Sequence, residues 1–322
     1  MPLRDIVNNP HDGFFQAVLG HKETAGNFFE NYLPAAVLKV LDVKTLQIKK
    51  NSFIEKELKR FYSDILYQVA SKNGKAYIYL LFEHQSSPDS FISFRFLRYI
   101  VKIWELELKQ RPKIKLLPPI IPLILYHGKR KWDSGTRLSD IIALGDKEEL
   151  KLYVPDYHYI LYDLSAYSDE QIQGNIMIKI FLDLFKHIFD EDLLSHLKRI
   201  FPMMKALSLN DRSGLEYIEL VLRYIMSTRG DATPEKLKKI VEETISKNRG
   251  GIIMTVAEQL IEKGERKGRE EGMEKGIEKG ELIGDIRIAQ LKKGMLISDK
   301  KELETLSIEE LRTKLEEMES LV

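Results

Sequence analysis

The sequence predicts an α+β protein in which a small mixed sheet is followed by a long helical C-terminal region. Two observations lead to this prediction. Short segments of the first half are apolar throughout or alternate between apolar and polar residues, as strands do. Between them, and almost continuously from Asp169, apolar residues recur every three or four positions, as in amphipathic helices. The predicted order of the first half is helix, three strands, helix and strand.

Length and composition limit the function classes. A chain of 322 residues exceeds the common domain size of about 100–150 residues, so we expect more than one module. Hydrophobic residues make up 43% and charged residues 31%, which is typical of a folded globular protein. Lysine and arginine number 50 against 49 acidic residues, so any attraction to nucleic acid must come from local patches and not from net charge.

The chain has no cysteine, which excludes disulfides, thiolate catalysis and thiolate zinc sites, and favours a reducing cytoplasm. The longest apolar stretch, residues 116–126, is much shorter than the roughly 20 residues of a spanning helix. The N-terminus lacks the unbroken apolar run of a signal peptide. We therefore expect neither a membrane partner nor export.

The elements of the first half follow in order. After Pro10, apolar spacing predicts one or two helices that end near Pro34, with Asp12 as a candidate cap. Three extended segments come next, of which the last two are separated by a turn sequence, SKNGK. This pattern predicts a β-meander over residues 41–50, 61–70 and 76–85.

A second amphipathic helix is predicted for residues 89–110, because Pro112 cannot continue it. The apolar run at 120–128 is rich in isoleucine and is typical of an interior strand. A further strand is expected within 157–165.

The remaining chain is predicted to be helical, and Ser307 with Glu310 forms a capping-box signature for a final short helix. The pattern divides the protein into a core, a helical module, a charged glycine-repeat segment and a short C-terminal helical segment. We place these four parts at residues 1–168, 169–250, 251–290 and 291–322.

The glycine-repeat segment has a glycine at every fourth position among charged residues. These glycines are Gly264, Gly268, Gly272, Gly276, Gly280 and Gly284. Each glycine inside a helix costs about 1 kcal/mol relative to alanine, so a compensating contact is expected. A four-residue step keeps them near one face, which permits close approach of a second helix or of nucleic acid. The alternative is a flexible charged tether.

Two strand carboxylates, Asp64 and Glu83, are the candidate reaction centre. Glu83 and Gln85 are two apart and point to the same face of a strand, while His84 points away. If the two strands form a hairpin, Asp64 can lie across from Glu83. Two carboxylates on neighbouring strands suit Mg²⁺, with Mn²⁺ as a substitute, and such a site fits phosphodiester hydrolysis. The alternative is a pair of ordinary solvent-facing acids.

The helix at 89–110 carries basic residues at near-helical spacing, and Tyr99 adjoins one of them. Such a stripe can contact DNA phosphates, but Glu105 in the same row favours an ordinary solvated face. The candidate DNA-binding residues are Arg95, Arg98, Tyr99 and Lys102, with Lys109 at the far end of the stripe.

The order of elements and the positions of the acidic residues resemble the PD-(D/E)XK nuclease superfamily. More narrowly, the chain is similar to the Rpn family of recombination-promoting nucleases, also described as YhgA-like transposases. The resemblance covers most of residues 8–200. The segments that carry it are PHDGFF at 10–15, YLP at 32–34, SDILY at 63–67, LLFEHQSSP at 80–88, FRFLRYIVKIWE at 94–105, IPLILYHG at 121–128, Trp132 and ILYDLS at 160–165.

The resemblance implies a restriction-endonuclease-like core of αβββαβ order with a mixed central sheet. It implies Asp64 and Glu83 as Mg²⁺ ligands, with the backbone carbonyl of His84 as a third. The superfamily's usual lysine is replaced by Gln85, which carries no charge and is no base. Gln85 would then position the attacking water.

Several other polar residues are candidates for an accessory or a structural role. His11, Asp12 and Glu30 are candidate accessory residues near the site, although capping and solvent exposure explain Asp12 and Glu30 as well. His127 and Asp163 are interpreted as structural. The leading hypothesis is a cytoplasmic, Mg²⁺-dependent DNA endonuclease with a role in recombination or element mobility. The alternative is a catalytically inactive DNA-binding or assembly protein on the same fold, and the glycine repeat suggests a homo-oligomer.

Overall fold

The computed structural model describes residues 10–49, 64–72, 74–83, 89–128, 130–145, 148–207, 212–244 and 247–320. The chain forms two compact units, Met1–Ala257 and Glu258–Val322. The finer four-part division expected from the sequence stays a prediction. No helix in the described ranges combines the length and apolar character needed to cross a membrane.

From Pro10, where the description begins, the first unit has the helices α2 (Pro10–Leu19), α3 (Lys22–Tyr32) and α4 (Ala35–Leu38) before the sheet. Asp12 lies inside the first turn of α2 and not at a capping position before it. Its negative charge still suits the positive end of the helix dipole. Two helices before Pro34 therefore match the sequence pattern, whereas the proposed cap does not.

A five-stranded sheet follows these helices. Its strands are β1 (Leu41–Lys49), β2 (Ile65–Ser71), β3 (Gly74–Glu83), β4 (Ile120–Tyr126) and β5 (Ile160–Asp163). They lie side by side in chain order, with β1, β2 and β3 antiparallel and β3, β4 and β5 parallel. The prediction of an α+β protein with a mixed sheet is confirmed.

The predicted hairpin joins β2 to β3. Ser71 pairs with Gly74, and Gly74 has a φ of 121°, a conformation that glycine adopts without a steric penalty. Farther along, Ile65 pairs with Leu80. This register fixes which residues of the two strands are neighbours.

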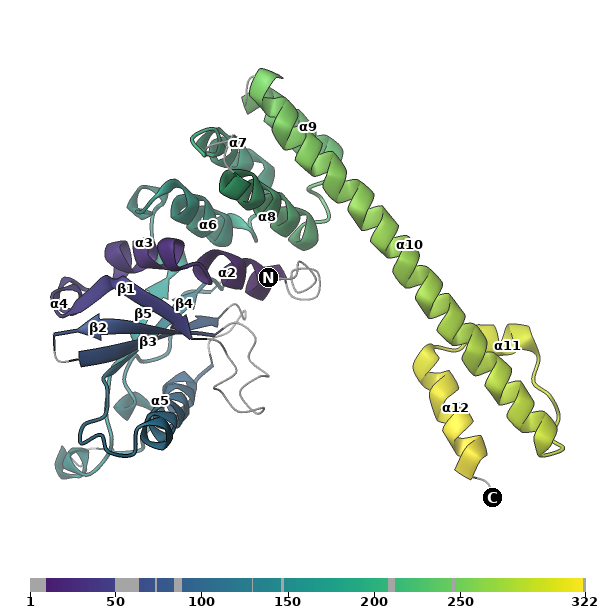
Figure 1. The fold of residues 1–322 in the computed structure, drawn as a ribbon, viewed down its shortest axis with the longest axis horizontal. Helices are drawn as coiled ribbons and strands as arrows, with labels where there is room; N and C mark the ends of the chain where they lie inside the picture. Colours follow the sequence, from purple (N-terminus) through teal and green to yellow (C-terminus); the bar gives the residue numbers. More distant parts are fainter. Residues whose placement is uncertain are drawn as a thin grey trace. The chain divides into compact units, whose positions relative to one another are not determined.

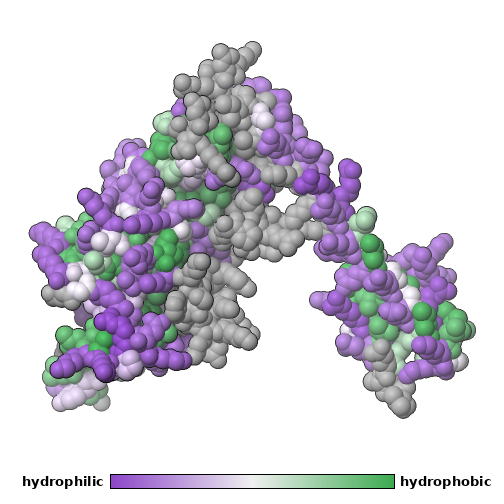
Figure 2. Space-filling model, in the orientation of Figure 1, coloured by the Kyte–Doolittle hydropathy of each residue, from purple (hydrophilic) through white to green (hydrophobic). Residues whose placement is uncertain are grey.

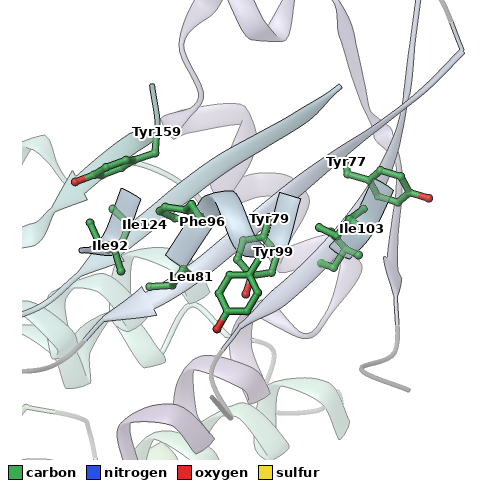
Figure 3. Close-up of a cluster of buried hydrophobic side chains, with 10 residues drawn as sticks. Tyr77, Tyr79, Leu81, Ile92, Phe96, Tyr99, Ile103, Ile124 and Tyr159 are labelled. Atoms are coloured by element: carbon green, nitrogen blue, oxygen red, sulfur yellow. The ribbon is translucent and has the colours of Figure 1, made fainter. Parts of the chain in front are cut away.

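Helices cover both faces of the sheet (Figure 1). One face packs against α5 (Ile92–Gln110), where Tyr79 and Leu81 of β3 contact Phe96 and Tyr99 of the helix (Figure 3). On the other face, Phe15 of α2 stacks on Phe82, with ring centroids 4.6 Å apart. Strand β3 is therefore buried on both sides, as its apolar sequence predicts.

The first unit continues through short 3₁₀ turns into a group of helices. The turns are η3 (Ser139–Ile141), η4 (Glu148–Leu152), η5 (Leu164–Ala166) and η6 (Asp169–Gln171). The helices are α6 (Ile176–His187), α7 (Leu193–Met204), α8 (Arg212–Thr228) and α9 (Pro234–Thr244). Tyr224 of α8 stacks on Phe14 of α2 at 4.3 Å, so these helices share a core with the sheet's covering layer.

The second unit contains most of α10 (Lys247–Lys292), together with α11 (Lys300–Glu304) and α12 (Ile308–Ser320). Its core includes Ile283, Ile286, Leu303 and Leu311. The predicted capping box is confirmed, because Ser307 N donates to Glu310 Oε2 at 2.7 Å and Glu310 N donates to Ser307 Oγ at 3.2 Å.

The six repeat glycines all lie within α10, and a Cβ atom added at any of them would meet nothing within 4 Å. The glycine repeat is therefore helical. Apolar side chains are visible at the surface of this unit (Figure 2), and the exposed ones on α10 include Met273, Ile277, Ile288 and Leu291.

Candidate functional site

Asp64 and Glu83 lie at the ends of neighbouring strands. Asp64 directly precedes β2, and Glu83 is the last residue of β3. Because Ile65 pairs with Leu80, Glu83 lies beyond the position directly across from Asp64. The two carboxylates still interact, since the charge of Glu83 raises the pKa of Asp64. The hairpin therefore brings the two predicted acids together, although not as a directly paired couple.

Both carboxylates are removed from solvent. Asp64 is 6% exposed and Glu83 is 3% exposed, so neither is an ordinary surface acid. Burial is the largest effect on Asp64 and raises its pKa to about 7, against the lowering effects of Arg95 and of a hydrogen bond from Tyr79. Asp64 therefore titrates near neutral pH unless additional positive charge is brought to it.

The two oxygens of Asp64 have different surroundings. The hydroxyl of Tyr79 donates to Oδ2 at 2.5 Å. Oδ1 is buried and accepts no hydrogen bond from any residue that the structure describes. The backbone carbonyl of Asp64 accepts from Gln16 Nε2 of α2 at 3.3 Å, which fixes the strand end itself. One buried oxygen thus lacks the donor that such atoms normally have.

Arg95 of α5 places a positive charge beside these acids. Its Nη1 atom is 3.4 Å from Glu83 Oε2 and 4.0 Å from Asp89 Oδ2. Burial opposes the charged form of Arg95, but the carboxylates of Asp64 and Glu83 raise its pKa above the ordinary value. Arg95 is thus part of the carboxylate cluster.

The other candidate DNA-binding residues separate into two groups. Arg98 and Lys102 are exposed on α5, and Lys102 pairs with Glu105 at 3.1 Å. Tyr99 is buried, with its ring 5.0 Å from that of Tyr79. The predicted stripe therefore presents two basic residues outward, while the tyrosine packs inward.

The accessory candidates also differ in position. Asp12 is buried, and its charge raises the pKa of Asp64. The Nδ1 atom of His11 is 2.9 Å from the Tyr224 hydroxyl, and its ring lies 4.9 Å from that of His127. Glu30 is exposed on α3 and makes none of the contacts described above for the carboxylates. His84 and Gln85 lie outside the described residues.

His127 and Asp163 make contacts that suit the structural interpretation. The backbone N–H of His127 donates to the Glu83 carbonyl at 3.1 Å, which ties the end of β3 to the segment after β4. Asp163 accepts from Trp132 N at 3.0 Å and from Ser165 N at 2.9 Å, and so caps η5.

The sequence analysis does not single out two members of the cluster, Tyr79 and Gln16. Their patterns indicate only an aromatic residue of an apolar strand and a polar residue of a helix. For Tyr79 a signal exists, because it lies four residues before Glu83 and therefore on the same face of β3. The contact of Gln16 depends on tertiary packing between α2 and β2.

The fold and this cluster define an α+β protein with two buried, interacting carboxylates at the ends of adjacent strands. Residues 9–216 match the family model described as "Putative transposase, YhgA-like". The chain belongs to this family, that of the recombination-promoting nucleases, as the resemblance predicted.

Curated relatives cover most of the chain. The chain is 31% identical over 261 residues to "Recombination-promoting nuclease RpnA" of Escherichia coli K12, covering 80% of this chain and 86% of the relative. Identity to "Recombination-promoting nuclease RpnD" of Escherichia coli O157:H7 is 29%, covering 79% of this chain and 95% of the relative. "Inactive recombination-promoting nuclease-like protein RpnE" of Escherichia coli K12 is also 29% identical, with 81% and 84% coverage. No solved structure matches the chain significantly.

Proposed function

We propose that this protein is a metal-dependent DNA endonuclease that hydrolyses phosphodiester bonds in recombination or element mobility. The observation that carries the proposal is the buried Oδ1 atom of Asp64, which has no hydrogen-bond donor among the described residues and lies in the same cluster as Glu83. Burying a carboxylate without a compensating partner is costly, and a bound cation removes that cost. The nuclease names of several relatives support the same class of activity.

The fold supports a restriction-endonuclease-like core. Helices precede three antiparallel strands, α5 follows, and β4 then pairs parallel to β3. This arrangement supports the αβββαβ order with a mixed sheet that the PD-(D/E)XK resemblance implies. Asp64 and Glu83 lie in the second and third strand regions, where the resemblance places its acidic residues.

The residues present fit a hard divalent cation. Asp64 and Glu83, together with the backbone carbonyl of His84, would supply the all-oxygen ligands that Mg²⁺ prefers, with Mn²⁺ as a substitute. When bound, the cation would lower the pKa of a water molecule and offset negative charge on the phosphate. Tyr79 fixes Oδ2 of Asp64, which leaves Oδ1 for the ligand role. Gln85 would orient the attacking water.

The DNA partner would be bound partly through α5. Arg98 and Lys102 project from the exposed side of α5. Arg95 lies on the side that faces the sheet, where it contacts Glu83. Phosphate contacts from such residues position a duplex without reading its sequence. Arg95 would add positive charge at the cluster itself.

A second candidate function is a catalytically inactive DNA-binding or assembly protein. It is favoured by two relatives whose names include the word inactive, RpnE and YjiP. A supercoiled-plasmid assay with Mg²⁺, Mn²⁺, Ca²⁺ or EDTA separates the candidates. Cleavage that needs Mg²⁺ or Mn²⁺ and disappears in Asp64→Ala supports the nuclease. DNA binding without cleavage under any condition supports the inactive protein.

We also propose that α10 pairs with α10 of a second copy. Its exposed apolar residues Met273, Ile277, Ile288 and Leu291 and the intervening Gly280 and Gly284 lie on one side of a helix with 3.6 residues per turn. Acidic residues, among them Glu274 and Glu281, flank one edge of this side, and Arg269 and Arg287 flank the other. Because opposite edges meet in a parallel pair, this charge pattern favours parallel helices.

A further inference from the structure

A second group of metal-ligating side chains lies apart from the carboxylate cluster, where η6, α6 and α7 meet. Asp169, His187 and His196 each offer a ligand atom, and these three atoms lie within 4.8 Å of one another. Asp169 belongs to η6, His187 ends α6 and His196 is in α7. We propose that these residues form a binding site for a transition-metal ion of the Zn²⁺ type, which stabilises the helical part of the first unit.

The contacts of His187 are the first argument. Its Nδ1 atom lies 2.6 Å from Asp190 Oδ2, and its Nε2 atom lies 2.9 Å from Asp169 Oδ1. A neutral imidazole has a single N–H group, so it can satisfy only one of these carboxylates by donation. Either a second proton or a metal ion at Nε2 resolves the other contact. With a metal ion there, Asp190 would orient the ring as outer-shell carboxylates do at histidine–metal sites.

The second argument is the position of His196. Its ring stacks on that of His187, with centroids 3.9 Å apart and planes 16° from parallel. Two protonated imidazoles at this distance would repel, whereas two neutral ones can share a cation once one ring has rotated, because a metal ion binds in the plane of an imidazole ring. The His196 side chain is 30% exposed, so it has room to rotate toward the shared position, while His187 is held by its buried surroundings.

Two basic residues compete for the same carboxylate. Lys186 Nζ is 2.5 Å from Asp169 Oδ1, and Arg199 bonds to Asp169 Oδ2 and, at 2.6 Å, to Asp183 Oδ1. Metal binding therefore requires Lys186 to leave Oδ1, while Arg199 can keep its contacts with Oδ2 and Asp183. The structure thus describes a site whose affinity is reduced by an internal lysine.

The ligand chemistry sets this site apart from the Asp64–Glu83 cluster. Two imidazole nitrogens and one carboxylate oxygen, completed by water, suit Zn²⁺, Co²⁺ or Ni²⁺, whereas Mg²⁺ prefers oxygen ligands alone. Since η6, α6 and α7 each give one ligand, an ion here would stabilise the folded state by an amount that grows with the logarithm of the ion concentration above its Kd. The inference is independent of the proposed nuclease activity.

The test uses the full-length chain without a histidine tag, with excess Mg²⁺ to fill the oxygen site. We expect one equivalent of Co²⁺ to give visible absorption, and Zn²⁺ to displace it and raise the melting temperature. His196→Ala should abolish both responses, and Asp190→Asn should weaken Zn²⁺ binding by about tenfold or more. His21→Ala, which removes an exposed histidine elsewhere, is the matched control and should bind like the wild type.

Lys186→Gln provides a test that does not depend on losing a ligand. Removing the competing amine should tighten Zn²⁺ binding. A gain in affinity cannot result from partial unfolding, so this test is not confounded by a disturbed fold. Absence of Zn²⁺ binding in both the wild type and Lys186→Gln would show an ion-pair network only and overturn the proposal. Equal Zn²⁺ affinity in wild type and His196→Ala would overturn it too.

Discussion

The hydroxyl of Tyr79 donates a hydrogen bond to Oδ2 of Asp64 at 2.5 Å, from the strand that also carries Glu83. This bond favours the ionised carboxylate, because it lowers the Asp64 pKa that burial raises. It also distinguishes the two oxygens, because Oδ2 accepts this bond and Oδ1 accepts none from the residues that the structure describes. The charge state of Asp64 thus depends, after burial and the charge of Arg95, on a residue whose own pKa is raised well above its ordinary value.

Tyr79→Phe should therefore move the acidic limb of the cleavage pH profile to higher pH. Without the hydrogen bond the Asp64 pKa rises above about 7. The ionised carboxylate that is needed for metal binding then forms only at higher pH. The measurement is kcat/KM for plasmid cleavage against pH at one fixed Mg²⁺ concentration below saturation, where protons and Mg²⁺ compete for Asp64. Tyr77→Phe is the control, since Tyr77 lies on the same face of β3 but bonds to Glu107. Superimposable profiles for Tyr79→Phe and wild type would contradict the assignment.

Asp64→Ala and Glu83→Ala should each abolish cleavage while the protein stays folded. A metal ion contributes several kcal/mol of charge stabilisation at such a site, so loss of one carboxylate is expected to slow cleavage by more than about 100-fold. Gln85→Ala should be milder, because Gln85 is proposed only to orient water. Cleavage rates are compared after circular dichroism has shown an intact fold. Wild-type rates in both carboxylate variants would remove these residues from the reaction.

Asp64 should also make the metal-free protein more stable as the pH falls. Its folded-state pKa, about 7, is above the ordinary value of 3.8, so the folded protein binds the extra proton between these limits. The penalty for burying the charge is complete above about pH 7 and is relieved as the pH falls toward 4. Urea unfolding in EDTA should show a smaller gain for Asp64→Asn than for wild type between about pH 8 and about pH 5. Identical pH dependence in the two proteins would argue against a raised pKa.

Arg98→Ala and Lys102→Ala should weaken DNA binding similarly for all sequences. Loss of one phosphate contact is expected to reduce the slope of log affinity against log salt by about 1. Fluorescence anisotropy with two unrelated duplexes over a range of salt concentrations measures both effects. Lys39→Ala removes an exposed lysine at the end of α4 and should leave binding unchanged. If Arg98→Ala behaves like Lys39→Ala at every salt concentration, the exposed side of α5 is a solvated face.

Removal of residues from Gly264 onward should leave the first unit folded and reduce self-association or DNA retention. Every described member of the carboxylate cluster lies before this point, so the cluster does not need the removed segment. Light scattering and DNA binding are compared for the truncated and full-length chains. Ile277→Glu in the full-length chain tests the apolar side of α10 without a deletion. Unchanged particle mass and affinity in both variants would mean that α10 is only a tether.

The sequence predicted the sheet better than it predicted the contacts within it. Alternation and apolar runs located β2, β3 and β4 because burial directly selects those residues. Alternation does not fix the register of a hairpin to the exact residue, so the pairing of Ile65 with Leu80 was not predictable. The sequence suggested Glu83 across from Asp64, whereas Glu83 lies farther along β3.

Helical spacing likewise grouped Arg95 with Arg98 and Lys102, but it could not show that Arg95 is turned toward Glu83. That orientation depends on how α5 packs on the sheet, which is a tertiary property. In α10, propensity favoured either a frayed tether or a partnered helix, and spacing alone did not decide between them. The structure has a continuous helix there, while its partner is still a proposal.

The short distances along the chain between members of the carboxylate cluster have a consequence for synthesis on the ribosome. Tyr79 and Asp64 are 15 residues apart, and Arg95 and Glu83 are 12 apart, whereas the His11–Tyr224 contact spans 213 residues. Short loops cost less entropy to close. A nascent chain that has emerged only through β4 already contains the whole described cluster, before the helices that cover α2 have been translated. The described carboxylate cluster and the helices that cover α2 are therefore synthesised at different times.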